Sequence, residues 1–233
     1  MRGSNTLTNA VVYHSNTGQS KAVAAYLAER LGYALVEMNE EKPFVAATLV
    51  LVFPVHGQDM PNVVKTFLRR VSAENLAAGA TYGKMCHGNV LQEIQKKYFD
   101  RVVAGAYVPA KHTYLEENAE LDFSALEPLI EKIKCPERVE IPRSYQNPLA
   151  NVLPKLRIRM SGKIVKSEAC VHCGTCEHVC AYKAMQNGKV GANCVRCLKC
   201  VSMCPQGALR FHPSIFLRLY LRKKKQNETV IYV

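Results

Sequence analysis

The stretch Ala10-Val11-Val12-Tyr13-His14-Ser15-Asn16-Thr17-Gly18-Gln19-Ser20 begins as a short apolar strand and continues as a turn rich in hydroxyl groups. The residues from about Lys21 to Leu31 then predict an amphipathic helix that ends at Gly32. A turn in this place directs backbone N–H groups at a phosphate, although helix capping alone is the alternative. The stretch has neither an ATP-binding loop nor a three-glycine dinucleotide motif, so neither ligand is indicated.

The alternation of strands and helices continues through the N-terminal part of the chain. The further expected strands are Ala34–Met38, Thr48–Phe53, Ala78–Tyr82 and Arg101–Val108. The further expected helices contain Val63–Leu68, Asn89–Tyr98 and Ser124–Lys134. Five strands joined by helical crossovers predict an α/β fold with a doubly wound parallel sheet.

The turn itself is similar to a known phosphate loop. Ser15-Asn16-Thr17-Gly18-Gln19-Ser20 resembles the S/T-x-T-G-x-S/T loop of flavodoxins, which holds the phosphate of FMN. The loops that end at Gly57 and begin at Thr81 fall where flavodoxins place the two loops beside the flavin ring. The resemblance implies a flavodoxin-like sheet of strand order 2-1-3-4-5 and FMN as cofactor. A degenerate flavodoxin shell that only docks partners is the alternative.

The flavodoxin resemblance also implies the residues of the FMN site. The phosphate loop residues are Ser15, Asn16, Thr17, Gly18, Gln19 and Ser20, and the ring-flanking residues are Pro54, Val55, His56, Gly57, Thr81, Tyr82, Gly83, His87 and Gly88. The chain has no tryptophan, which leaves Tyr82 as the candidate for stacking on the ring. His56, Tyr82 and His87 are candidates for a catalytic role near the flavin, and no catalytic residue is assigned. Asn16 also departs from the glycine common in relatives.

Eight of the ten cysteines form two copies of the spacing C-x2-C-x2-C-x3-C, one shortly after the other. This is the spacing of two-cluster bacterial ferredoxins, where the fourth cysteine of each run binds the cluster of the other run. The spacing therefore predicts two [4Fe–4S] clusters. The first ligand set is Cys170, Cys173, Cys176 and Cys204, and the second is Cys194, Cys197, Cys200 and Cys180.

Other uses of the cysteines fit the spacing less well. Structural zinc favours two C-x2-C pairs with a longer spacer, although His172 and His178 inside the first run offer extra ligands. A disulfide framework does not require three thiols at such regular intervals. Cys86 and Cys135 stand outside the runs and are expected to be inert thiols.

A flavodoxin-like domain followed by a two-cluster ferredoxin domain is similar to the flavodoxin–ferredoxin fusion proteins of anaerobes. This resemblance implies an iron–sulfur flavoprotein of electron transfer, which passes electrons between its clusters, its FMN and a partner or small acceptor. An FMN-dependent reductase of a small molecule is one alternative, and an oxidoreductase activity is expected. A flavin-free ferredoxin on a docking domain is the other.

The expected domains are a flavodoxin-like domain over residues 1–140, a linker over 141–163, a two-cluster domain over 164–212 and a basic tail over 213–233. The tail mixes apolar and basic residues and is expected to pack on the first domain, with a membrane surface as the alternative.

The formal net charge of +12 predicts an acidic redox partner, and no motif indicates nucleic acid. A homodimer is possible. The first residues resemble no secretory signal, and cluster cysteines must stay reduced, so a cytoplasmic location is expected.

Overall fold

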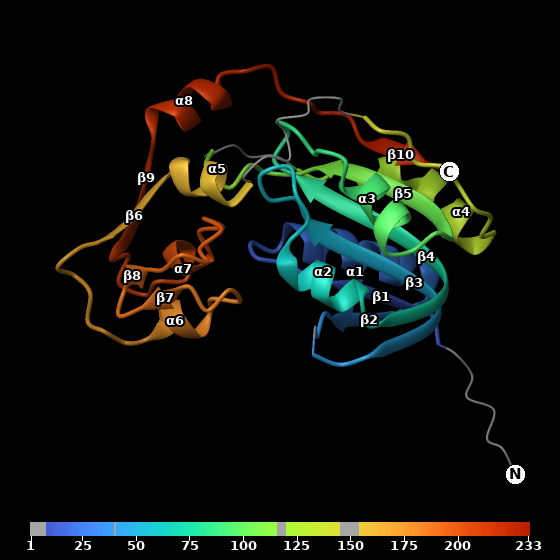
Figure 1. Ribbon diagram of the computed structural model, residues 1–233, viewed down its shortest axis with the longest axis horizontal. Coiled ribbons are helices and arrows are strands. Elements are labelled where there is room, and N and C mark those ends of the chain that lie inside the picture. The colour runs from blue at the N-terminus through green and yellow to red at the C-terminus, as the bar shows by residue number, and fades with distance from the viewer. Residues whose placement is uncertain (1–7, 40, 116–119, 145–153) are drawn as a thin grey trace, which may run out of the picture.

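The computed structural model describes residues 8–39, 41–115, 120–144 and 154–233. It contains an α/β unit built on one large sheet and a smaller cysteine-rich unit that lies beside it (Figure 1). We call residues 8–144 with 230–232 the sheet unit and residues 162–213 the cysteine-rich unit.

The sheet has six strands in the order β2-β1-β3-β4-β5-β10. Its strands are β1 Ala10–Tyr13, β2 Ala34–Glu37, β3 Phe44–Pro54, β4 Val71–Tyr82, β5 Val102–Pro109 and β10 Val230–Tyr232. The first five are parallel, and their order 2-1-3-4-5 is the one predicted and is consistent with a flavodoxin-like fold. The prediction of five strands was wrong by one, because β10 adds antiparallel to β5 at the edge of the sheet.

Strands β3 and β4 are longer than the apolar runs that predicted them. Their pairing extends from Phe44 beside Val71 to Pro54 beside Thr81. The first residues of β4 alternate between half-buried and exposed, with Ser72 and Glu74 in solvent. A continuous apolar run marks only the half of a strand that is covered on both faces, so the exposed half escaped prediction.

Two helices cover each face of the sheet. Helix α1 (Gln19–Leu31) and helix α4 (Glu127–Lys134), which follows the 3-10 turn Ser124–Leu126, pack on one face. Helix α2 (Asn62–Leu68) and helix α3 (Val90–Lys97) pack on the other. Helix α1 ends as predicted at Gly32, whose left-handed conformation (φ 68°) suits glycine and closes the last turn.

The cysteine-rich unit consists of short elements around two antiparallel strand pairs, β6 with β9 and β7 with β8. The elements in chain order are β6 Gly162–Lys166, α6 Thr175–His178, β7 Met185–Gln186, β8 Lys189–Val190, α7 Lys199–Ser202 and β9 Leu209–Pro213. Helices α6 and α7 start at equivalent positions of the two cysteine runs, each one residue before the third cysteine of its run.

The two cysteine runs also share their backbone conformation. Positive φ angles occur at His172 and Gly174 in the first run and at the equivalent positions, Arg196 and Leu198, in the second. Side chains adopt this region at a cost on the order of 1 kcal/mol, and such conformations persist where the surroundings determine them. The repeat in the sequence is therefore a repeat in the structure.

Two short helices flank the cysteine-rich unit. Helix α5 (Pro154–Met160) and the start of β6 fall within residues 141–163, the predicted linker, of which 145–153 lie outside the described residues. Helix α8 (Ile215–Leu221) and β10 fall within the predicted tail. In the described part of the chain, no helix has both the length and the apolar character needed to cross a bilayer.

Strand β10 gives a test of how the end of the chain contributes to stability. The ring of Tyr232 contacts that of Tyr107, and its hydroxyl lies 3.0 Å from Ser144 Oγ. We expect Tyr232→Ala to lower the free energy of unfolding by about 2 kcal/mol, because Tyr232 is half-buried and loses both contacts. Chemical denaturation followed by circular dichroism measures the change. The matched control Val233→Ala, at an exposed position, should change it by less than about 0.5 kcal/mol, and equal effects would contradict a packed β10.

Candidate functional site

A cavity of about 420 Å³ lies at the carboxyl ends of the parallel strands, where the sheet unit meets the cysteine-rich unit. In doubly wound folds this edge of the sheet is where ligands bind. Eleven of the fifteen residues predicted for an FMN site line the cavity. They are Asn16, Thr17, Gln19, Ser20, Pro54, Val55, His56, Gly57, Thr81, Tyr82 and Gly83.

The four other predicted residues do not line it. Ser15 accepts a hydrogen bond from the N–H of Gly18 (3.1 Å), and both stay in the turn before α1. His87 is buried behind the cavity, where its ring stacks on Tyr107 at a centroid distance of 3.5 Å and its Nδ1 lies 2.8 Å from the carbonyl oxygen of Gly88. Burial lowers the pKa of His87. The structure therefore puts His87 in the core, outside the lining of the cavity.

Two glycines allow the loops around the cavity to approach one another. Gly88 has φ +66°, and a Cβ there would collide with the carbonyl oxygen of Gln58. A Cβ at Gly83 would overlap the ring of His112. The loop after β4 thus packs on the loop after β3 at one glycine and on the loop after β5 at the other.

The turn before α1 supplies the polar end of the cavity. Helix α1 begins at Gln19, directly after Gly18 in a left-handed conformation (φ 89°). Gln19 Oε1 is buried and has no hydrogen-bond partner among the described residues. The Ser20 hydroxyl is already 2.7 Å from that of Thr81, which joins the turn to the end of β4. An unsatisfied amide at a helix N-terminus fits a ligand that carries phosphate and hydroxyl groups.

A polar network at the edge of the cavity joins the two units. The hydroxyl of Tyr182, which follows Cys180 closely in the chain, lies 3.4 Å from Asn16 Nδ2, from His56 Nδ1 and from His14 Nε2. The Asn16 amide also donates to His56 Nε2 at 3.1 Å, so the proton of neutral His56 is on Nδ1. Burial, with a smaller contribution from His14, lowers the pKa of His56 to about 3, and burial together with Lys199 lowers the pKa of His14 to about 4.

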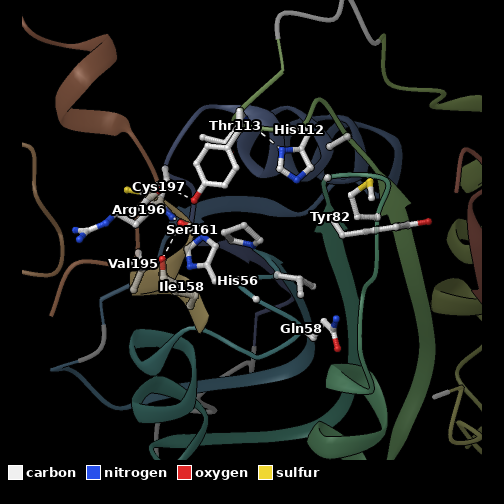
Figure 2. Close-up of a pocket in the computed structure, with 18 of the residues that line it drawn as sticks. His56, Gln58, Tyr82, His112, Thr113, Ile158, Ser161, Val195, Arg196 and Cys197 are labelled. Carbon is white, nitrogen blue, oxygen red and sulfur yellow. Dashed lines mark hydrogen bonds between the residues drawn. The ribbon is translucent and has the colours of Figure 1, made fainter. Parts of the chain in front are cut away.

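The other walls of the cavity were not predicted. The loop after β5 contributes His112 and Tyr114, and the Tyr114 hydroxyl donates to the carbonyl oxygen of Arg196 in the cysteine-rich unit (2.9 Å). Figure 2 shows Tyr82 and His112 on one side of the cavity and Ser161, Val195 and Cys197 on the other. The only signal in the sequence was the position of residues 110–114 after the last parallel strand, since the remaining walls come from distant segments.

The first predicted set of cysteines surrounds a cavity of its own. Cys170, Cys173, Cys176 and Cys204 all line a space of about 30 Å³ in the cysteine-rich unit. Three of them come from one run and the fourth from the other, as the spacing predicted for a shared site. None of the ten cysteines forms a disulfide.

The members of the second predicted set influence one another electrostatically. Burial, and then the charges of Cys197, Cys194, Cys180 and, from the first set, Cys176, raise the pKa of Cys200 to about 12. Burial also raises the pKa of Cys197 to about 11. Thiols in such surroundings ionise readily only when a cation binds them. Cys197 has a second property, because it lines the large cavity next to Arg196.

Backbone N–H groups point at sulfur atoms at equivalent positions of the two runs. The N–H of Ala184 donates to Cys180 Sγ and that of Ala208 to Cys204 Sγ, both at 3.3 Å. Within the described ranges, no three His, Cys, Asp or Glu side chains converge closely enough to hold one metal ion. In a four-iron cluster each iron takes a different thiolate, so the sulfurs surround the cluster. The two [4Fe–4S] clusters therefore stay a prediction.

Comparisons with known proteins add little. No family model and no curated protein matches the chain. Among solved structures, a Bacteroides uniformis protein assigned as a flavoprotein matches with a TM-score of 0.43 and 15% identity, over 53% of this chain and 97% of that one. A similarity of this size carries no conclusion about the present chain.

The close approach at Gly88 can be tested by substitution. Gly88→Ala should lower the free energy of unfolding by about 3 kcal/mol. The new Cβ would collide with the carbonyl oxygen of Gln58, and the positive φ of residue 88 is unfavourable for alanine. Gly32→Ala is the matched control, because its φ of +68° is nearly the same and nothing lies within 4 Å. It should cost only about 1 kcal/mol. Equal losses in denaturation experiments would mean that the two loops separate easily.

Proposed function

We propose that this chain is an iron–sulfur flavoprotein of electron transfer, with FMN at the carboxyl edge of its sheet and two [4Fe–4S] clusters in its cysteine-rich unit. The observation that carries the proposal concerns Cys197. It belongs to the second predicted ligand set and also lines the cavity formed by the predicted FMN loops. When bound, the clusters would supply one-electron carriers and FMN a group that takes one or two electrons.

The cavity supports FMN by its polar end and by its walls. Backbone N–H groups at the start of α1 and the hydroxyl of Thr17 would bind the phosphate. The buried amide of Gln19 would bond a hydroxyl of the cofactor. Residues 54–57 and Tyr82 would flank the flavin ring. Neutral His56 would keep its hydrogen bonds to Asn16 and Tyr182, which hold the two units together. No other phosphate motif competes for this place.

The two cysteine sets have different positions relative to the cavity. Of the eight cysteines, Cys197 lines the large cavity, whereas Cys170, Cys173, Cys176 and Cys204 line the smaller one. The second set is therefore the one next to the flavin site, and the first set would receive electrons from outside. Cys173 is exposed and Val171 is 63% exposed, so the surface at the first set is accessible to a partner.

The charge distribution supports an acidic partner at this end. Residues 141–227 contain 16 Lys and Arg but two Glu, whereas the remaining residues contain 15 Lys and Arg against 17 Asp and Glu. The positive charge thus belongs to the segment that carries the cysteines. Opposite charge would speed the encounter with an acidic electron carrier.

One observation favours a second candidate function, an FMN-dependent reductase of a small molecule. The cavity extends beyond the predicted flavin loops to His112, Tyr114 and Tyr220. These side chains would stand over a bound ring and provide room for an acceptor. A carrier that exposes only the edge of its flavin does not need such walls.

The cofactor content of anaerobically purified protein is the first test. We expect about eight iron, about eight sulfide and one FMN per chain. Iron without FMN would leave a flavin-free ferredoxin on a docking domain. FMN without iron would contradict the cluster assignment and with it the electron-transfer proposal.

Single cysteine variants test the two ligand sets. Cys204→Ser and Cys197→Ser should each reduce the iron content to about four per chain, because each removes one ligand of a different cluster. Both variants should keep FMN, since neither changes the phosphate turn. Cys135→Ser, at an exposed cysteine outside the runs, is the matched control and should keep about eight iron. Loss of both clusters from either variant, or an unchanged iron content, would contradict two independent sets.

A further inference from the structure

Helix α8 presents an apolar face to solvent. Ile215, Phe216 and Leu219 are 61%, 66% and 53% exposed, and at about 100° per residue they occupy one continuous arc. Leu217 on the inner side is buried, and Phe216 and the half-buried Tyr220 lie between the inner side and the exposed arc. All three side chains line the large cavity. A helix that is apolar on both sides normally has both sides covered. Here the outer side is not covered by any described part of the chain.

The position of α8 is well defined. Its first turn is capped by Ser214, whose hydroxyl accepts a hydrogen bond from the N–H of Leu217 (3.2 Å). The N–H of Ser214 donates to the carbonyl oxygen of Ser161 (2.9 Å), so α8 starts where α5 has just ended. Met160 at the end of α5 is 49% exposed and lines the same cavity as Leu217. Figure 1 shows α8 at the outer margin of the molecule.

Basic residues border this face. Arg218, Arg222, Lys223 and Lys224 are exposed, and no Asp or Glu stands between His178 and Asn227. We call Ile215, Phe216, Arg218, Leu219, Arg222, Lys223 and Lys224 the α8 face. An exposed apolar arc with a basic border is the pattern of helices that lie in the interface of an anionic membrane.

We propose that the α8 face docks this protein on the surface of a membrane rich in anionic phospholipids, with Ile215 and Leu219 in the interface, Phe216 at its margin beside the cavity, and the basic residues on the headgroups. At the α8 face, in contrast to the surface at the first cysteine set, the run of basic residues supports a lipid surface over a protein partner. Protein interfaces are depleted in lysine at their centre, whereas a run of lysines attracts the diffuse charge of many headgroups. The docking is independent of whether the chain holds FMN or iron.

This proposal also accounts for the tail. The sequence led us to expect that the tail packs on the sheet unit, and β10 does pair with β5. Helix α8 contributes Phe216, Leu217 and Tyr220 to the lining of the cavity, which leaves Ile215 and Leu219 exposed for another occupant. A peripheral attachment needs no spanning helix.

Co-sedimentation of the full-length chain with vesicles tests the docking. One set of vesicles is phosphatidylcholine alone, and the other contains about one-third phosphatidylglycerol. We expect about tenfold stronger binding to the anionic vesicles, most of it lost at about 0.5 M salt, because salt screens the attraction. Equal binding to the two sets, or no binding to either, would overturn the proposal.

Two variants identify the face. Ile215→Ser/Leu219→Ser removes apolar surface at two exposed positions that do not line the cavity, and Arg222→Glu/Lys224→Glu reverses charge. Each should reduce binding to the anionic vesicles about tenfold. The matched control is Lys42→Glu/Lys96→Glu, which makes the same change in net charge at exposed positions of the sheet unit and should bind as the original chain does.

Other occupants of the face give different results. The full-length chain could fail to bind vesicles and instead form a dimer. If the variant Ile215→Ser/Leu219→Ser abolishes that dimer, then a second copy covers the α8 face and the proposal is wrong. If the control variant loses vesicle binding as fully as Arg222→Glu/Lys224→Glu, then net charge alone drives the binding, and the α8 face is not the docking site. Circular dichroism of every variant verifies that the compared chains are folded.

Discussion

The parallel pairing of β3 with β4 is the constraint on which the candidate site depends. Because Pro54 pairs with Thr81, the two strands end at the same level, and the loops that follow them start side by side. The Ser20 hydroxyl reaches Thr81 from α1, which brings the first turn to the same edge. Three segments far apart in the sequence thus form one polar margin. A shift of one position in this register would turn alternate side chains away from the cavity.

The contact between the two units forms the opposite side of the cavity. Tyr182 reaches Asn16 and His56 from one side, and Tyr114 reaches the backbone of Arg196 from the other. Both contacts fall close in the chain to predicted cluster ligands. The polar groups involved are partly buried, so leaving them without partners would cost more than exposing an apolar contact of similar size. The orientation of the units is therefore specified by directional bonds at the cavity.

Much of this arrangement was accessible from the sequence, and what was missed has physical causes. Buried parallel strands are continuous apolar runs, so the sequence predicted that each of the first five strands exists, although β3 and β4 begin earlier than predicted. The resemblance of the turn before α1 to a flavodoxin phosphate loop implied their order, which the sheet has. Strand β10 is very short and exists only because β5 has a free edge, which no local pattern reveals. His87 resembled a flavin neighbour because it stands in the correct loop, but its ring stacks on Tyr107 of another strand. Tyr182 gave no signal, since its partners belong to distant parts of the chain.

The chain passes between its two units twice, and the two connecting segments are hydrogen-bonded to each other at both ends. At the sheet unit, Ser144 on the outgoing segment is bonded to Tyr232 on the returning one (3.0 Å). At the far side, Ser161 on the outgoing segment accepts a hydrogen bond from Ser214 on the returning one (2.9 Å). A unit that is joined by a single flexible linker can rotate in many directions relative to its neighbour. Two connections that are hydrogen-bonded to each other restrict the relative motion of the units to rotation about a single hinge axis. The cysteine-rich unit is in this sense an insertion in the sheet unit, and any movement that opens the cavity must work against both connections at once.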